Sequence, residues 1–250
     1  MFRLDDKIAL VTGAATGIGQ AIAVTLAKAG AHAAISDRPN VSLDETEERC
    51  QPYGKKIFKF EMDVRDLDQI KKGVTTVEAE FDHVDILVNS AGINRPTPGV
   101  EVDQENWKDH FNTNVRGGFF CAQAVVKKMI ERKFGRIIFI SSQSGLIGIP
   151  GQIVYCTTKG AVVNMVRAMG VEWGKYGITV NSVAPTFVET NLTRERLKNP
   201  DFLKFVLGKI PKGEIATPED VAHAVVYLAS DEAGITNCVN LPVDGGWTAW

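Results

Sequence analysis

A tyrosine and a lysine lie four residues apart in the stretch Tyr155-Cys156-Thr157-Thr158-Lys159. If this stretch is helical, the two side chains share one face, because residues i and i+4 are neighbours on a helix surface. An unperturbed tyrosine has a pKa of about 10 and is a poor base near neutral pH. A lysine ammonium nearby favours the phenolate and is expected to lower that pKa. Such a pair can take a proton from an alcohol or donate one to a carbonyl.

A glycine-rich segment with the spacing Gly-x3-Gly-x-Gly follows the first apolar run and precedes a helical pattern. Glycines at such a place allow a tight turn and let the backbone approach a pyrophosphate at a helix N-terminus. The segment is therefore a candidate dinucleotide-phosphate site. The residues expected to contact the cofactor here are Gly13, Thr16, Gly17, Ile18 and Gly19.

Asp37 ends the second apolar run, 18 residues after Gly19. A carboxylate in this position can accept hydrogen bonds from the adenosine ribose hydroxyls. It would also repel a 2′-phosphate, because close like charges are costly in a partly buried pocket. Asp37 therefore favours NAD over NADP as the cofactor. Arg38 stands beside it, and an arginine there can bind the 2′-phosphate, so NADP remains the alternative.

Short β-rich runs alternate with helical patterns from one end of the chain to the other. Several runs are apolar throughout, which is typical of parallel strands covered on both faces. The alternation predicts an α/β fold: a single-domain Rossmann-type, doubly wound parallel sheet of about seven strands with helices on both faces. The expected strands cover residues 8–11, 33–36, 57–61, 86–89, 137–141, 179–183 and 238–242.

Several helix ends can be read from the sequence. Residues 42–45, Ser-Leu-Asp-Glu, fit a capping box. Thr217 followed by Pro218 predicts a helix start, while Gly30 and Gly54 stand where helices are expected to stop.

One domain is expected to cover residues 1–250. The stretch 186–217 breaks the alternation of strands and helices, and we interpret it as a substrate-binding lid inserted within that domain.

Composition narrows the function classes. Hydrophobic residues are 44% and charged residues 23%, close to the average of globular proteins. The formal net charge of −2 argues against nucleic acid or an anionic membrane as the main partner. The chain has no apolar run near the ~20 residues of a spanning helix and no apolar N-terminal signal region, so we expect a cytoplasmic protein. Its cysteines and histidines lack ligand spacing, so no metal site is predicted.

Further motifs appear in a fixed order along the chain. Residues 89–92, Asn-Ser-Ala-Gly, follow the fourth expected strand, and Asn114 falls in the next helix. Ser142 follows the fifth expected strand and precedes Tyr155 by 13 residues, and Val-Asp-Gly-Gly occupies residues 243–246. With the glycine turn and the Tyr–Lys pair, these motifs identify a resemblance to the short-chain dehydrogenase/reductase family. The resemblance covers essentially all 250 residues.

The resemblance implies a catalytic set of four residues, Asn114, Ser142, Tyr155 and Lys159. Ser142 would polarise the substrate oxygen by hydrogen bonding. Lys159 would also hold the nicotinamide ribose, and Asn114 would position Lys159 through a water molecule. The hydride transfer itself belongs to the nicotinamide.

The resemblance also implies further cofactor contacts. Asp63 and Val64 would hold the adenine, and a segment after the sixth strand would contact the carboxamide. The remaining expected contacts are Asn89, Ala91, Gly92, Pro185, Val188 and Thr190. At two positions, Thr186 and Asn237, the family usually has glycine. Both changes replace a residue that tolerates positive φ with one that prefers negative φ.

Five residues are expected to contact the substrate, namely Arg95, Ser142, Gln143, Gln152 and Tyr155. Two amides and an arginine near a carbonyl site favour a polyhydroxylated or carboxylated ligand, because an arginine can bind a carboxylate bidentately. Asn94-Arg95 and the Gly-Gly-Trp of residues 245–247 are similar to the gluconate and deoxygluconate type of sugar-acid dehydrogenases in the family. We therefore expect NAD(H)-linked interconversion of a secondary alcohol and a ketone on a sugar acid, deoxy-sugar acid or polyol.

Two other functions are weighed against this one. A 3-oxoacyl-carrier-protein reductase using NADP(H) could dock its acidic carrier on four cations near one helix end, Lys127, Lys128, Arg132 and Lys133. The same cations would also complement the dipole of that helix. A non-catalytic dinucleotide-binding subunit is disfavoured, because the Tyr and Lys that such proteins typically lose are both present.

The resemblance further implies a homotetramer. It would be built from the long helices expected around 104–133 and 152–173, with Trp250 able to reach a neighbouring subunit.

Overall fold

Seven parallel strands form one sheet in the order β3-β2-β1-β4-β5-β6-β7. The computed structural model describes residues 2–190 and 193–249. Its strands are β1 (Ile8–Thr12), β2 (His32–Asp37), β3 (Ile57–Glu61), β4 (Ile86–Asn89), β5 (Gly135–Ile140), β6 (Ile178–Pro185) and β7 (Asn240–Val243). The predicted fold class and all seven predicted strands are confirmed. The last strand begins two residues later than expected, after Cys238, whose φ is +62°.

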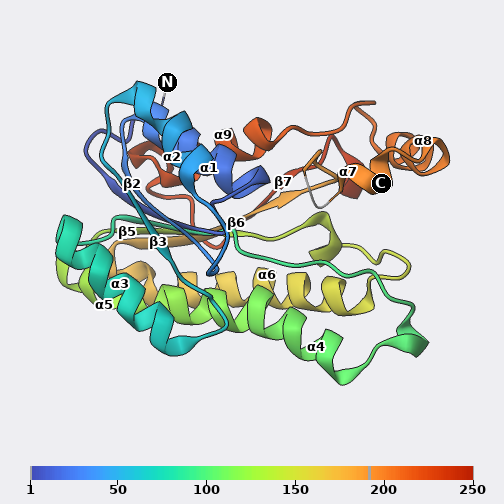
Figure 1. Ribbon diagram of the computed structural model, residues 1–250, viewed down its shortest axis with the longest axis horizontal. Helices are drawn as coiled ribbons and strands as arrows, with labels where there is room; N and C mark the ends of the chain where they lie inside the picture. Colours follow the sequence, from blue (N-terminus) through green and yellow to red (C-terminus); the bar gives the residue numbers. More distant parts are fainter. Residues whose placement is uncertain (1, 191–192, 250) are drawn as a thin grey trace.

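Helices cover both faces of the sheet (Figure 1). On one face lie α1 (Gly17–Ala29), α2 (Asp44–Cys50) and α9 (Pro218–Ala229); on the other lie α3 (Leu67–Phe81), α5 (Gly118–Arg132) and α6 (Ile153–Trp173). Two hydrophobic clusters fill the space between the sheet and these layers, one on each side. Strands β1, β4, β5 and β6 are buried along their whole length, which explains the apolar runs of β1, β4 and β5. Strand β6 also buries polar side chains, Thr179, Asn181 and Ser182.

A single π-helical turn joins two helices on the second face. Helix α4 (Gln104–Phe111) runs into the turn Asn112–Gly117, which continues as α5. Gly117 passes close to the chain after β3, since a Cβ there would lie 2.6 Å from the Val64 carbonyl oxygen. The predicted helix at Asn114 is therefore present, but it is locally underwound because one extra residue is accommodated in the turn, a feature frequent at functional sites.

The predicted helix ends are mostly confirmed. Gly30 and Gly54 adopt left-handed conformations after their helices, with φ of +110° and +65°. Thr217 caps α9 and forms a capping box with Asp220. The capping box predicted at residues 42–45 is wrong. Because α2 begins only at Asp44, the Ser42 hydroxyl accepts from the Asp44 N–H instead.

Neither position that departs from the family's glycines needs positive φ. Among the described residues, positive φ occurs at Cys238 but not at Thr186 or Asn237. The Asn237 side chain instead joins two elements, because its Oδ1 accepts from Val180 N at 2.8 Å and its Nδ2 donates to the Gly170 carbonyl at 2.9 Å. Asn237 is thus a structural link between β6 and α6.

The stretch between β6 and α9 contains two short helices, α7 (Arg194–Leu197) and α8 (Pro200–Lys209), beyond the carboxyl ends of the strands (Figure 1). Its apolar side chains form a third cluster with Trp247. Among residues 2–190 and 193–249, no helix is long and apolar enough to cross a membrane.

Candidate active site

The carboxyl edge of the sheet collects nearly every side chain that the sequence marked for chemistry. The glycine turn follows β1, Asp37 ends β2, and Ser142 follows β5. The chain order reverses between β1 and β4, and ligands of open α/β sheets bind at such a switch point.

The glycine turn is shaped by close backbone approaches. A Cβ on Gly13 would lie 2.7 Å from the Ala91 backbone, and a Cβ on Gly19 would collide with the Gly13 carbonyl oxygen. Within the described chain, the Thr16 side chain makes no capping hydrogen bond to α1. The first N–H groups of α1 can therefore point at an anion, as a pyrophosphate requires.

Asp37 is fixed beside this turn. Its Oδ2 accepts from Ala15 N at 3.1 Å, and its Oδ1 accepts from Arg38 N at 2.8 Å. The carboxylate therefore has a defined direction next to the glycine turn, whereas the Arg38 residue is exposed. This geometry fits a diol at the adenosine end of a dinucleotide.

Asp63 and Val64 lie after β3, on the same edge. The Asp63 carboxylate is bound by Arg65, whose Nη2 donates to Oδ2 at 2.7 Å. Hydrogen bonds from Arg65 hold the pKa of Asp63 below its ordinary value. Asp63 therefore carries a negative charge at neutral pH, already partly engaged by a neighbour that the sequence reading had not considered.

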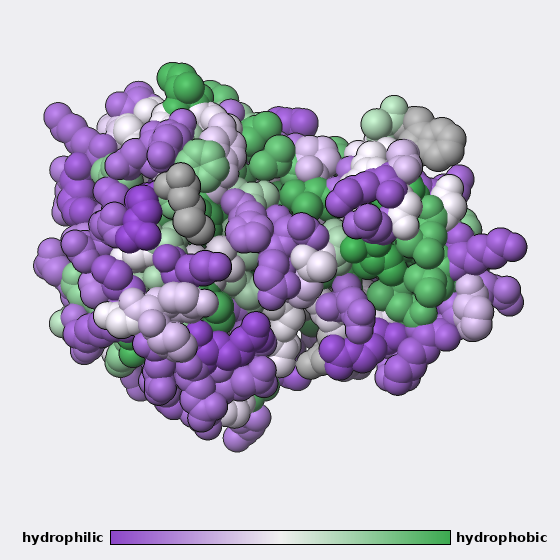
Figure 2. Space-filling model, turned by 90° about the horizontal axis from the view of Figure 1, so that it is seen from above, coloured by the Kyte–Doolittle hydropathy of each residue, from purple (hydrophilic) through white to green (hydrophobic). Residues whose placement is uncertain are grey.

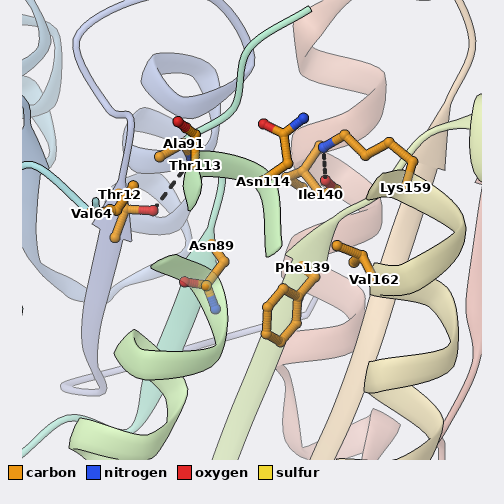
Figure 3. A pocket seen from close by; sticks show the side chains of 11 residues that line it. Thr12, Val64, Asn89, Ala91, Thr113, Asn114, Phe139, Ile140, Lys159 and Val162 are labelled. Carbon is orange, nitrogen blue, oxygen red and sulfur yellow. Dashed lines mark hydrogen bonds between the residues drawn. The ribbon is translucent and has the colours of Figure 1, made fainter. Parts of the chain in front are cut away.

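Lys159 lies deep below this edge, on α6, and is 6% exposed. Its ammonium donates to the Ile140 carbonyl oxygen at 2.8 Å (Figure 3). Burial lowers the pKa of Lys159 to about 8. The ammonium borders a small cavity of about 10 Å³, roughly the room of one water molecule, which Asn89 and Asn114 also line.

Asn114 fixes the loop after β4 against α6. Its Oδ1 accepts from Ile93 N at 2.8 Å, while its Nδ2 donates to the Ile93 carbonyl at 3.0 Å and to Thr158 Oγ1 at 3.1 Å. The π-helical turn presents this amide to both partners. Asn114 and Lys159 do not bond directly but line the same cavity, as the expected relay through a water requires.

Ser142 and Tyr155 meet at the same edge. Burial raises the pKa of Tyr155 to about 12, while the neighbouring Ser142 hydroxyl acts in the opposite direction. The Lys159 ammonium lies 5.5 Å from the centre of the Tyr155 ring. Lys159 is not among the groups that shift the Tyr155 pKa here, so the expected lowering by Lys159 stays a prediction, and the phenol is protonated at neutral pH.

Asn89 has unusual surroundings at the end of β4. Its side chain is buried, and neither its Oδ1 nor its Nδ2 finds a partner among the described residues. Ala91 is held nearby, where its N–H donates to Thr12 Oγ1 at 3.3 Å. Since buried amides are normally satisfied, Asn89 is available to a ligand or to a water in the adjoining cavity.

The segment after β6 folds back over the glycine turn. A Cβ on Gly17 would lie 3.2 Å from the Thr190 methyl group, and Val188 pairs with Ala216 in a short parallel bridge. Pro185 pairs with Val243 in β7. The three residues expected to contact the carboxamide, Pro185, Val188 and Thr190, thus lie at and after the end of β6. Thr190 lies against Gly17 of the glycine turn.

The predicted substrate residues divide into two groups. Gln143 and Gln152 are buried beside the Ser142–Tyr155 pair in the chain, and Gln152 Oε1 accepts from Asn94 Nδ2 at 3.1 Å. The side chain of Arg95 is 55% exposed and donates to Asp109 at 2.7 Å. Arg95 therefore forms an ion pair with Asp109 of α4. The residues next to Arg95 in the sequence could not predict this partner, which lies on another element.

The sequence reading missed several residues that the fold brings to the site. Thr158 holds Asn114, and the Ile140 carbonyl holds Lys159. An aromatic group forms above the edge, where the rings of Phe187 and Trp247 lie 5.7 Å apart. The sequence signals for this region were the interrupted stretch 186–217 and the Gly-Gly-Trp of residues 245–247, and neither predicted that the rings would meet.

The fold and the site together define a dinucleotide-binding oxidoreductase of the Rossmann type. A family model described as "Enoyl-(Acyl carrier protein) reductase" matches residues 13–248. A solved short-chain type dehydrogenase/reductase from Mycobacterium marinum is 33% identical with a TM-score of 0.94, covering 100% of this chain and 98% of the other. The chain belongs to the short-chain dehydrogenase/reductase family.

Relatives with different substrates are similarly close. The chain is 36% identical to a gluconate 5-dehydrogenase of Gluconobacter oxydans (strain 621H), covering 99% of this chain and 97% of that protein. It is 38% identical to a D-threitol dehydrogenase of Mycolicibacterium smegmatis, covering 99% and 95%. It is 36% identical to a 3-oxoacyl-(acyl-carrier-protein) reductase of Thermotoga maritima, covering 98% of each chain.

A solved gluconate 5-dehydrogenase of Burkholderia cenocepacia J2315, in complex with NADP and tartrate, also matches. It has a TM-score of 0.95 and 34% identity, and the match covers 100% of this chain and 98% of that chain.

Proposed function

We propose that this protein interconverts a secondary alcohol and a ketone on a sugar acid, a deoxy-sugar acid or a polyol, using NAD(H). The observation that carries the proposal is the cavity shared by Lys159 and Asn114, with the Lys159 ammonium 5.5 Å from the centre of the Tyr155 ring. Ser142 is close enough to Tyr155 to affect the pKa of the phenol. Similarity to a gluconate dehydrogenase and a threitol dehydrogenase over nearly the whole chain supports the substrate class.

The roles of the four side chains follow from their chemistry. A bound nicotinamide supplies or accepts the hydride. Ser142 donates to the substrate oxygen and keeps it next to the Tyr155 hydroxyl. Tyr155, protonated at neutral pH because burial raises its pKa to about 12, donates its proton to that oxygen as a carbonyl is reduced.

The proton given up by Tyr155 must be replaced. Lys159, with a pKa lowered to about 8, can lose and regain a proton near neutral pH and is therefore suited to resupply it. The cavity that Lys159 shares with Asn114 has room for the water that would carry it. In the oxidative direction the same groups act in reverse, and a higher pH favours the ionised Tyr155.

We propose NAD as the preferred cofactor, with Asp37 binding the adenosine ribose. The fixed carboxylate at the end of β2 supports this choice. The relative from Burkholderia cenocepacia holds NADP, so the exposed Arg38 could make NADP the second cofactor. The cofactor site is proposed to be completed by the glycine turn and by eight further residues, Asp63, Val64, Asn89, Ala91, Gly92, Pro185, Val188 and Thr190.

Three further expectations stay proposals. The segment 186–217 acts as a lid within a single domain of residues 1–250. The enzyme is a homotetramer that works in the cytoplasm, and sedimentation of the purified protein measures its assembly. Trp250, which we expected near a neighbouring subunit, lies outside the described residues.

A turnover panel tests the function. NAD(H) and NADP(H) are offered with sugar acids, deoxy-sugar acids, polyols and oxoacyl thioesters. We expect NAD-linked turnover of a sugar acid or polyol, and a loss of about 100-fold to 10,000-fold in kcat for Tyr155→Phe. Near wild-type turnover by that variant would refute the assigned mechanism.

The second candidate, a carrier-protein reductase, is favoured by the Thermotoga maritima relative. Turnover confined to oxoacyl thioesters with NADP(H) would establish it in place of the sugar-acid activity.

A further inference from the structure

A cleft of about 420 Å³ opens at the loop that links Ser142 to Tyr155 along the chain. One wall is the loop of residues 147–150, and the other walls are Phe205 and Lys209 of α8 and Trp247. Apolar side chains gather at this end of the molecule, over α8 (Figure 2). The cleft has the size of a small-molecule site, since ligand pockets usually measure about 300 to 1,000 Å³.

The loop that forms the first wall is tied at both ends to the candidate catalytic residues. Ile147 N donates to the Gln143 carbonyl at 3.0 Å, directly after Ser142. Gln152 N donates to the Ile149 carbonyl at 3.1 Å, at the start of the helix that carries Tyr155. The loop that forms this wall is therefore fixed relative to the residues that flank Ser142 and Tyr155, and we infer that a substrate bound by those two residues extends toward the cleft.

The side chains that line the cleft are mostly apolar, with a single cation. Ile147, Ile149, Pro150 and Phe205 offer no side-chain hydrogen bond, and Trp247 offers a single N–H donor. Lys209 is the cation of the lining, and it forms no ion pair with any residue that the structure describes. Phe205 and Lys209 share one face of α8, because they stand at positions i and i+4.

Two other cations near this end are already paired. Lys212 lies 3.4 Å from Glu214, and Lys198 lies 2.8 Å from Glu195. Arg95, the cation that the sequence singled out for a substrate carboxylate, donates to Asp109 instead. Lys209 is thus the unpaired positive charge on an otherwise apolar lining.

We propose that Lys209 binds the carboxylate of the substrate, and that the apolar wall selects an acid with few hydroxyl groups next to that carboxylate. A hydroxyl pressed against this wall would lose its water without gaining a partner, which costs roughly 10-fold in binding for each group. A deoxy-sugar acid fits the cleft better than a fully hydroxylated acid or a neutral polyol. This inference rests on the proposed function and specifies its substrate.

Variants of Lys209 test the carboxylate contact. Lys209→Met keeps the stem and removes the charge, Lys209→Arg keeps the charge, and Lys204→Met is a matched control on another face of α8. For Lys209→Met we expect KM for a deoxy-sugar acid to rise about 10-fold while KM for an alditol of the same chain length stays unchanged. Lys209→Arg and Lys204→Met should resemble the wild type.

The apolar wall is tested separately with Phe205→Asn, which places an amide in the cleft. The ratio of kcat/KM for a deoxy-sugar acid to that for the fully hydroxylated acid should fall about 10-fold in this variant. An unchanged ratio overturns the selection by the wall.

Several outcomes overturn the carboxylate contact. Sugar acids that turn over equally well with Lys209→Met leave the proposed function standing and refute the role of Lys209. Equal KM changes for acid and alditol assign Lys209 to the folding of the lid. A change of sedimentation with Lys209→Met makes the cleft an interface between copies of the chain.

If no acid in the panel is turned over, the proposed function fails, and calorimetry still tests the cleft. Deoxy-sugar acids are titrated into the wild type and Lys209→Met, both saturated with NAD. Binding by the wild type but not by Lys209→Met supports the carboxylate site, and binding by neither overturns it.

Discussion

Lys159 is a buried cation with one protein partner, the Ile140 carbonyl. Its pKa falls from 10.5 to about 8 on folding, because burial disfavours the charged form. Between about pH 8 and 10.5 the unfolded chain therefore binds a proton that the folded chain does not, and stability rises with pH. Below pH 8 both states are protonated, so the folded state carries the full penalty.

Lys159→Met should remove that penalty together with activity. We expect the free energy of unfolding of the wild type, relative to Lys159→Met, to increase by on the order of 2 to 3 kcal/mol between pH 8 and 10.5. Urea denaturation across this range measures the difference. Both proteins contain Tyr155, so its titration contributes to both curves and is removed by the comparison. A difference that stays flat with pH would show that Lys159 keeps an ordinary pKa.

Asp37 is the charge on which we propose that the cofactor preference depends. Asp37→Asn keeps an oxygen to accept from Ala15 N but removes the repulsion of a 2′-phosphate. We expect kcat/KM with NADP to rise about 10-fold while the value with NAD falls less. Initial rates with both cofactors measure this, and Arg38→Met should lower only the NADP value. A wild type that already prefers NADP would contradict the role given to Asp37.

Residue types and spacing predicted most of these side chains, because they follow strand ends and the carboxyl ends of parallel strands meet at one edge. Arg95 shows where that reasoning stops. Its partner Asp109 lies on another element, so the ion pair depends on how α4 packs. The Tyr155 pKa shows a second limit, since the extent of burial depends on the whole fold.

Asn237 links two elements that the sequence reading treated separately. Its amide bonds Val180 N, Cys238 N and the Gly170 carbonyl, between β6 and α6. Asn237→Gly restores the residue usual in the family but removes these bonds, and it should lower the unfolding free energy by about 2 kcal/mol. Chemical denaturation measures the loss.

Asn237→Ala is the matched control, because it removes the same bonds without adding backbone freedom. It should lose slightly less stability than the glycine variant. An increase in stability on Asn237→Gly would contradict the linking role.

At the scale of elements, β-rich runs predicted all seven strands, and the runs that are apolar throughout belong to strands buried on both faces. The helix start at residues 42–45 was misread because Ser42 bonds the nearer Asp44 N–H. A pattern of residue types cannot distinguish that turn from a cap.

The whole molecule separates its catalytic edge from its basic helix end (Figure 1). Helix α5 begins beside the turn that carries Asn114 and runs about 22 Å before ending at Arg132, at the opposite edge of the sheet. Two of the four cations there are engaged, since Lys128 lies 3.4 Å from Glu78 and Arg132 lies 2.8 Å from Asp85. A carrier docked at that end would face away from Tyr155.

Reversing the two remaining charges should therefore leave catalysis intact. We expect the double variant Lys127→Glu, Lys133→Glu to change kcat/KM by less than about 2-fold, whether the substrate is a small molecule or is joined to a carrier protein. Steady-state kinetics with both substrate forms measures this. A loss confined to the carrier-bound form would revive the docking patch and the carrier-reductase reading.

The π-helical turn at residues 112–117 has a consequence for the phase of the long helix that contains it. The turn contains one residue more than an α-helical turn. The extra residue shifts the helical positions of the side chains after it by about 100° relative to those before it. The stripes of α4 and α5 are thus out of register, although the chain runs through without a break. Deleting a single residue here would bring the buried faces of α4 and α5 into line and would move Asn114 away from Thr158. The turn therefore sets the angle between the Asn114 side chain, which binds the loop after β4, and the face of α5 that packs on the sheet.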